Sequence, residues 1–229
     1  MRTKRYISLL LAALMALSLA ACGAKDNKDK DKEGDMTIQP AQLSEEEQRL
    51  AELLALDMGA YHIFDFQAGS AKFVELNAYE LVDGEWSHLP GGGGAGLSSG
   101  SGRIALAFGK MTEGVRLAIQ ADGENYSASV QVEPGDDVSG MTFATSTLDD
   151  APLTIELGQE IPLVLQTVTS KNEVRFYKVD YFGMPRELAK AGYEHIYAIT
   201  VTFSDQDLGG GPQPASTTDE PSAEPSPEE

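Results

Sequence analysis

A serine and a histidine of this chain stand in an order used by hydrolases. The segment Gly96-Leu97-Ser98-Ser99-Gly100 matches the G-x-S-x-G pattern of a serine nucleophile, and His195 follows it as a candidate base. That pattern requires the serine to stand on a sharp turn between a strand and a helix. Here Ser98 lies in a Gly/Ser-rich segment that leads into a strand-like run, which is typical of a mobile loop. We therefore do not expect a serine hydrolase.

Metal ligands are the second kind of chemistry to consider. The three histidines, His62, His88 and His195, are too scattered to match the spacings of zinc sites. Acidic residues near turns could give oxygen ligands to Ca²⁺, namely Glu133, Asp136, Asp137, Asp149 and Asp150. Asp beside Gly or Pro also forms turns without a metal, and we interpret these residues in that way. We expect no metal and no cofactor.

Charge and cysteine content exclude further classes of protein. The 229 residues include 17 Lys and Arg against 36 Asp and Glu, for a net charge of -19. Nucleic-acid binding draws most of its affinity from cations that neutralise phosphates, so DNA and RNA are excluded as partners. The single cysteine excludes a disulfide framework and a four-thiolate zinc site.

That cysteine follows a segment with the features of a secretory signal. Positive charges precede an apolar run over residues 7–21, which is too short to span a bilayer, since spanning takes about 20 residues. The run ends in Leu19-Ala20-Ala21-Cys22-Gly23, which resembles the lipobox of bacterial lipoproteins. The resemblance implies that the thiol of Cys22 receives a diacylglycerol and that the signal peptide is cut just before it. We therefore expect a protein held by lipid at the cell membrane, facing outside the cytoplasm.

Composition divides the rest of the chain into three parts. Residues 22–42 form the lipid anchor and a charged tether with too little apolar surface to fold. Residues 43–205 form one domain, which is long enough to bury a core. Residues 206–229 are acidic and rich in Pro, as in disordered tails. The layout resembles that of small bacterial envelope lipoproteins of unknown function.

The domain is predicted to be mostly β, with one helix at its start. Ser44 and Glu47 form a capping box, and Leu50, Leu53 and Leu54 follow as an apolar stripe. From residue 61 onward, short runs of β-branched and aromatic residues alternate with turn residues. This pattern predicts an antiparallel sandwich of roughly 8–10 strands. A second, short helix is expected over residues 185–191, because Pro can begin a helix and Gly192 would follow its end.

Two hairpins can be aligned from their turn residues. A two-residue turn at Asp122-Gly123 pairs apolar or aromatic residues on one face, namely Ile119 with Tyr126, Leu117 with Ala128 and Val115 with Val130. The opposite, mostly polar face pairs Arg116 with Ser129, Ala118 with Ser127 and Gln120 with Asn125. The first face is expected in the core and the second in solvent. A turn at Asp83-Gly84 pairs Leu81 with Trp86 and Tyr79 with His88. In the last strand, we expect Tyr197, Ile199, Val201 and Phe203 to point to the core.

The hairpin at Asp83-Gly84 carries the candidate ligand contacts. Tyr79, Trp86 and His88 share one face, where exposed rings would stack on sugars and covered rings would belong to a core. We favour the core, with binding on loops at one end of the sandwich.

The function expected from the sequence is therefore binding rather than catalysis, with an unidentified ligand. A carbohydrate-binding sandwich is the first alternative. A hydrolase that uses carboxylates is the second, although no isolated pair of acidic residues stands out.

Overall fold

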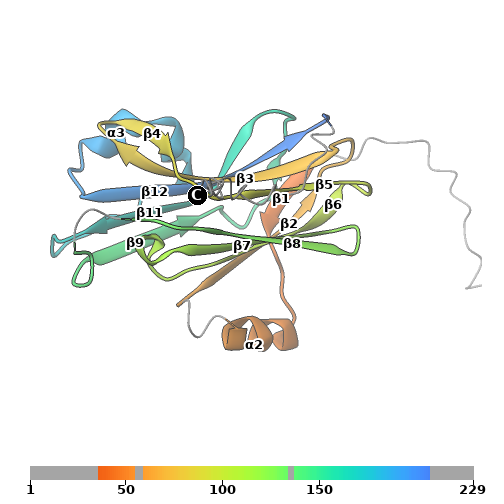
Figure 1. The fold of residues 1–229 in the computed structure, drawn as a ribbon, viewed down its shortest axis with the longest axis horizontal. Helices are drawn as coiled ribbons and strands as arrows, with labels where there is room; N and C mark the ends of the chain where they lie inside the picture. Colours follow the sequence, from red (N-terminus) through yellow and green to blue (C-terminus); the bar gives the residue numbers. More distant parts are fainter. Residues whose placement is uncertain (1–35, 55–58, 134–136, 207–229) are drawn as a thin grey trace, which may run out of the picture. The chain divides into compact units, whose positions relative to one another are not determined.

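Two antiparallel sheets face each other and enclose the core (Figure 1). A computed structural model of the chain describes residues 36–54, 59–133 and 137–206, which contain twelve strands. The predicted β-sandwich fold is confirmed. The expected signal peptide, Cys22, most of the expected tether and the acidic tail lie outside the described residues. Among the residues described, no helix has the length and hydropathy needed to cross a membrane.

Each sheet contains six strands. Sheet A has the order β10 (Leu153–Thr154), β1 (Thr37–Pro40), β2 (Tyr61–Gln67), β6 (Ser101–Ala107), β7 (Val115–Ala121) and β8 (Glu124–Val130). Sheet B has the order β4 (Glu85–His88), β3 (Phe73–Val82), β12 (His195–Ser204), β11 (Glu160–Thr169) and β9 (Thr142–Thr147), and β5 (Gly93–Gly96) also pairs with β3.

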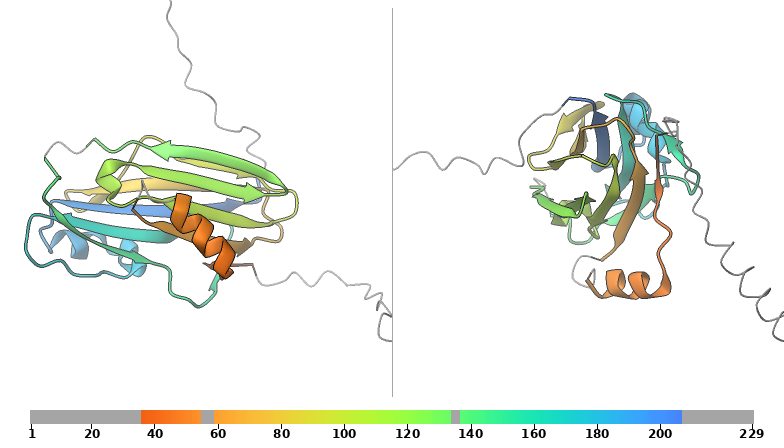
Figure 2. Two further views of the ribbon diagram at one scale, coloured as in Figure 1. Left: turned by 90° about the horizontal axis from the view of Figure 1, so that it is seen from below. Right: turned by 90° about the vertical axis from the view of Figure 1, so that its right-hand side faces the viewer.

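The helical segments lie in the connections between strands. They are α2 (Glu45–Leu54), η2 (Met111–Glu113), η3 (Val179–Gly183) and α3 (Pro185–Ala189). Helix α2 lies over the outward face of sheet A, whereas α3 lies beside β4 of sheet B (Figures 1 and 2). The predicted short helix is confirmed as α3, with Pro185 in its first turn and Gly192 beyond its end at a φ of 61°.

Both hairpins have the predicted register. Asp83 and Asp122 have φ values of 52° and 56°, and the glycine after each has a φ of 80°. Positive φ at both central residues defines the turn whose twist matches that of paired strands. Leu117 pairs with Ala128, and Leu81 pairs with Trp86, as their spacing predicts.

The core is built from the inward faces of the two sheets. In β12 the four residues predicted to point inward, Tyr197, Ile199, Val201 and Phe203, are fully buried. Sheet A contributes Phe64, Phe66, Ile104 and Leu106 to the same cluster. The alternation in β12 therefore identified its inward face correctly, although Ile196, Ala198 and Thr200 on the opposite face are also buried.

One prediction about the start of the domain was wrong. Residues 37–40 were assigned to the tether, but they form β1, which pairs with both β2 and β10 and buries Ile38 completely. The domain therefore begins before residue 43. The apolar stripe of α2 does not enter the core, because Leu50 is 56% exposed and Leu53 is 63% exposed.

The glycine-rich loop was a second difference. Residues 93–96 were expected in a mobile loop, yet they form β5 and pair with β3. A Cβ atom on Gly94 would collide with the ring of Phe73, so glycine allows β5 to lie against β3. Together with β1 and the two-residue β10, this strand raises the number in the described residues above the expected 8–10.

Candidate ligand-binding groove

The three predicted ligand contacts lie together on the outward face of sheet B. Phe182 of η3 covers Trp86, with ring centroids 5.0 Å apart and planes at 22°. The indole Nε1–H of Trp86 donates a hydrogen bond of 2.8 Å to the carbonyl oxygen of Phe182. Phe182 thus occupies a place where a sugar ring would stack on Trp86, and the indole is partly buried.

Tyr79 and His88 are engaged by other side chains. The ring of Tyr79 meets His88 edge-on at 5.3 Å and Phe182 at 5.7 Å. Nε2 of His88 lies 3.0 Å from Oδ1 of Asn77. Burial, followed by the nearby Glu160 carboxylate, raises the pKa of Tyr79. The geometry favours a small aromatic cluster under η3 over an open sugar platform, as we expected in part from the sequence.

The serine pattern is not assembled into a catalytic site. The backbone N–H groups of Ser98 and Ser99 donate to the Asp122 carboxylate at 2.6 and 2.7 Å. Hydrogen bonds from Ser99 and then Ser98 lower the pKa of Asp122 to about 2. His195 is buried on β12, where its Nδ1 lies 2.9 Å from a carboxylate oxygen of Glu80. Within the described part of the chain, no contact joins Ser98 to His195.

Candidate calcium ligands are likewise used for local structure. The Asp137 carboxylate accepts a 3.0 Å hydrogen bond from the backbone of Ser139, which lowers its pKa. Asp149 forms an ion pair of 2.9 Å with Lys178. Asp136 lies outside the described residues, and those that are described contain no group of three or more potential metal ligands. The ring of His62 lies 5.2 Å from that of Phe108 at a tilt of 42°, and burial lowers the pKa of His62.

The outward face of sheet A carries a groove that the sequence did not reveal. Its volume is about 540 Å³, and its lining is mostly apolar. Strand register places small side chains in a row across the floor, where Ala105 faces Ile63 on one side and Ala118 on the other. Ala51 of α2 also lines the groove, and α2 lies across the outward face of sheet A (Figure 2). Pockets of a few hundred Å³ with apolar linings are typical of small-molecule sites.

A row of polar side chains runs beside this floor. Register aligns five residues across five strands in the order Gln39, Asp65, Arg103, Gln120 and Asn125. Neighbouring strands are about 4.8 Å apart, so the row extends about 19 Å across the sheet. A second hollow of about 610 Å³ lies over most of this row. The apolar floor and the polar row therefore form one continuous face.

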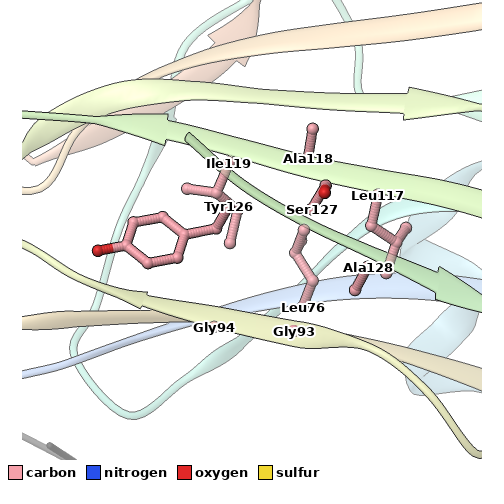
Figure 3. Close-up of a pocket in the computed structure, with 9 residues that line it drawn as sticks. All are labelled: Leu76, Gly93, Gly94, Leu117, Ala118, Ile119, Tyr126, Ser127 and Ala128. Carbon is pink, nitrogen blue, oxygen red and sulfur yellow. The ribbon is translucent and has the colours of Figure 1, made fainter. Parts of the chain in front are cut away.

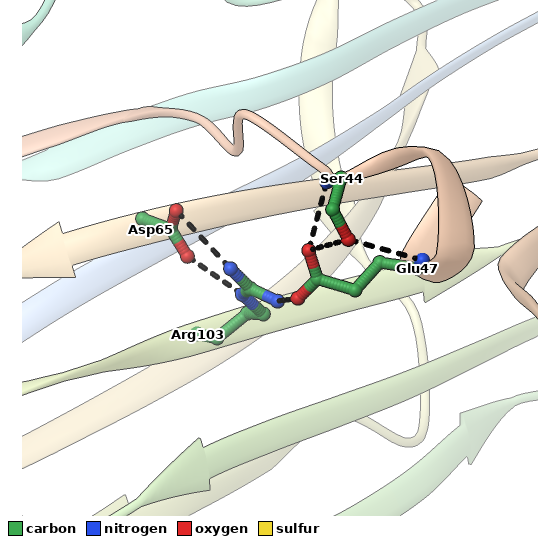
Figure 4. Close-up of polar contacts among 4 residues, drawn as sticks. All are labelled: Ser44, Glu47, Asp65 and Arg103. Carbon is green, nitrogen blue, oxygen red and sulfur yellow. Dashed lines mark hydrogen bonds and ion pairs between the residues drawn. The ribbon is translucent and has the colours of Figure 1, made fainter.

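An ion-pair network fixes α2 against this face (Figure 4). Arg103 binds Asp65 through Nε at 2.7 Å and binds Glu47 of α2 at 3.1 Å. The predicted capping box is confirmed, because the backbone N–H and hydroxyl of Ser44 each lie 2.8 Å from the Glu47 carboxylate. These hydrogen bonds, and then the one from Arg103, lower the pKa of Glu47 to about 2. Glu47 thus caps its own helix and joins the helix to the sheet.

A smaller cavity lies between the two sheets, where β5 approaches β7 and β8 (Figure 3). Its volume is about 10 Å³, and Tyr126, Leu76 and Gly94 are among the residues that line it. A space of this size holds at most one water molecule. It does not qualify as a ligand site, whereas the groove on sheet A is large enough to be a candidate.

Part of this groove could be predicted from the sequence. The face assignment in β7 and β8 correctly placed Ala118, Gln120 and Asn125 toward solvent. Nothing in the sequence showed that β6 and β2 would continue the same rows, because those pairings join residues about 40 positions apart. No family model, curated protein or solved structure matches the chain.

Proposed function

We propose that the protein is a lipid-anchored binding protein of the bacterial cell envelope, and that its groove on sheet A binds an extended neutral carbohydrate. The lipobox resemblance around Cys22 supports the anchor and the outward-facing location. The observation that carries the ligand assignment is the pairing of an apolar floor with a row of planar polar groups on one sheet face.

This combination matches the two surfaces of a sugar. The C–H groups of a sugar ring pack on small apolar side chains, such as those of Ala105, Ala107 and Ala118, and on the ring of Tyr61. Sugar hydroxyls need partners that both donate and accept hydrogen bonds, which the amides of Gln120 and other row residues provide. A floor of small residues leaves room for the ring on an otherwise flat sheet.

The groove presents one cation without an ion pair in the described residues, Arg116, and its other polar groups are neutral or paired, which favours a neutral ligand. Arg103 is already bound by two carboxylates, those of Asp65 and Glu47. Gln39, Gln120 and the other amides of the row are uncharged. An anionic polymer would meet a domain with many more acidic than basic residues, and long-range repulsion would oppose its approach.

A carboxylate-using hydrolase gains little support from the same face. Glu47 and Asp65 are brought close by Arg103, but general acid catalysis near neutral pH needs a carboxyl group with a raised pKa. The hydrogen bonds from Ser44 instead lower the pKa of Glu47 to about 2. We therefore retain binding as the proposed activity.

Calorimetric titration of the detergent-solubilised full chain with cellohexaose, chitohexaose and maltohexaose tests this proposal. Ala118→Trp fills the floor, and we expect it to weaken binding of the preferred sugar about tenfold or more, since one lost apolar contact and a steric clash exceed 1.4 kcal/mol. Gln120→Ala should weaken binding without filling the groove. Ala151→Trp makes the same substitution at an exposed position outside the groove and should leave affinity unchanged.

Melting temperatures of the variants show whether each one is folded. Binding of none of the three sugars would contradict the carbohydrate assignment. Equal affinity of the wild type, Ala118→Trp and Gln120→Ala would contradict the groove as the site.

A further inference from the structure

The segment between β11 and β12 is unusual in its charge. Half of the ten Lys and Arg residues between positions 36 and 206 lie in it, namely Lys171, Arg175, Lys178, Arg186 and Lys190. The rest of that region is strongly acidic. A pocket of about 550 Å³ opens here, lined by three of these cations and by Tyr177 and Tyr193. Its surroundings therefore differ in charge and in aromatic content from the groove on sheet A.

The pocket is held in shape by contacts that do not involve a ligand. Nζ of Lys171 donates to the carbonyl oxygens of Ala191 and Gly192 at 2.8 and 2.5 Å, and it stands 5.1 Å from the ring centroid of Tyr193. The Tyr193 hydroxyl accepts a hydrogen bond of 2.9 Å from the backbone N–H of Arg175. Tyr177 packs edge-on against Tyr193 at 6.3 Å. Because these contacts already order the wall of the pocket, less conformational entropy is lost when a ligand binds.

Arg175 is the cation in this pocket that is left for a ligand. Lys190 is paired with Glu187 at 2.6 Å, and Lys171 is used by the carbonyl groups. In the residues that the structure describes, the guanidinium of Arg175 has no ion pair and no side-chain hydrogen bond, although Glu173 is only two positions away. The side chain is exposed, and the neighbouring Phe176 is 75% exposed.

We propose that this pocket is a second binding site, for a small sugar that carries a carboxylate or a phosphate. The guanidinium of Arg175 presents a planar fork that binds either anion through two hydrogen bonds. The rings of Tyr177 and Tyr193 supply an apolar surface for the body of the ligand. The site is independent of the groove on sheet A and of its proposed ligand.

Three probes of matched size test the proposal. The detergent-solubilised full chain is titrated calorimetrically with glucuronate, glucose 6-phosphate and glucose. We expect one or both anions to bind, with glucose at least tenfold weaker, because glucose lacks the charge-assisted bidentate contact with Arg175. The two anions distinguish a carboxylate ligand from a phosphate ligand. Binding should weaken as salt is added, since the pocket is open to solvent.

Three variants test whether the anion binds in this pocket. Arg175→Gln should weaken binding of the anion at least about tenfold. Arg49→Gln removes the same charge from α2, where Arg49 is exposed and pairs with Glu45, and should have no effect. Tyr193→Phe keeps the ring but removes the hydroxyl that holds the Arg175 backbone, so its effect should be intermediate.

Three results would overturn the second site. They are failure of both anions to bind, an unchanged affinity in Arg175→Gln, and an equal loss in Arg49→Gln, which would indicate non-specific charge attraction. Ala118→Trp should leave anion binding unchanged, so failure of the groove proposal and failure of this one can be told apart.

Discussion

Truncation of Trp86 to alanine tests how the outward face of sheet B is covered. Trp86 is partly buried between β3, β4 and η3, where it stacks on Phe182 and donates a hydrogen bond to the carbonyl of the same residue. The substitution removes both interactions along with the buried part of the indole. If Trp86 were instead an open platform for sugars, its loss would change stability very little.

The magnitude follows from these contacts. Loss of a fully buried Trp side chain costs about 3 to 5 kcal/mol. Stacking contributes about 0.5 to 1.5 kcal/mol and the hydrogen bond about 1 kcal/mol, and the apolar area removed is only part of the side chain. We therefore expect Trp86→Ala to lower the free energy of unfolding by about 2 to 3 kcal/mol. For a domain of this size, that corresponds to a decrease in Tm of about 4 to 12 °C.

Thermal and urea unfolding measure the loss, and two further variants divide it. Trp86→Phe keeps a ring but removes the N–H donor, and should cost about 1 kcal/mol. Phe182→Ala keeps the backbone carbonyl, so a double-mutant cycle with Trp86→Ala isolates the stacking at about 1 kcal/mol. Ser87→Ala changes an exposed neighbour on β4 and serves as the control. A Trp86→Ala protein with the Tm of the wild type would refute the reasoning.

Three further predictions concern other parts of the molecule. In urea unfolding, Gln166→Ala should lower the free energy of unfolding by about 2 to 4 kcal/mol. The Gln166 side chain accepts a hydrogen bond of 2.6 Å from the buried backbone N–H of Met111, and the substitution leaves that donor without a partner. An unchanged unfolding midpoint would contradict this. Carboxyl NMR should give a pKa of about 2 for Glu47, and Arg103→Gln should raise that pKa only part of the way to its ordinary value, because the Ser44 bonds remain. Since the pKa is lowered in the folded state, the contribution of Glu47 to stability is present above its ordinary pKa and fades as the pH falls toward 2. Mass spectrometry of membrane extracts should find diacylglycerol on an N-terminal Cys22, and a Cys22→Ser protein that stays equally membrane-bound would contradict the anchor.

Local sequence signals predicted local structure well. The Asp-Gly turns fixed the register of two hairpins, because only a few residue types adopt positive φ at both central positions. The capping box at Ser44 and Glu47 correctly placed the start of α2. In each case, the determining contacts lie within a few residues of one another.

Features that depend on distant partners were missed. β1 becomes a strand only because β2 and β10 provide hydrogen-bonding neighbours on both sides. The glycines of β5 were predicted to lie in a loop. Small residues are needed there because a larger one would collide with Phe73 of β3, which is distant in sequence. The apolar stripe of α2 did not show where the helix would lie, and the Arg103 network holds α2 with Leu50 and Leu53 exposed.

The candidate site was predicted least well for the same reason. Trp86, Tyr79 and His88 were correctly placed on one face, but η3 comes from about 95 residues later in the chain and covers Trp86. The groove needs the rows of five strands in register, of which the sequence aligned only β7 and β8.

The most direct test of the groove is alanine-methyl NMR of the full chain during titration with the hexasaccharide that binds best. The methyl groups of Ala105, Ala107 and Ala118 line the floor, whereas those of Ala78 and Ala198 are buried in sheet B. The proposed function predicts that the three floor signals shift with saturation while the two buried signals stay in place. Saturable binding that leaves the floor signals unmoved would contradict it.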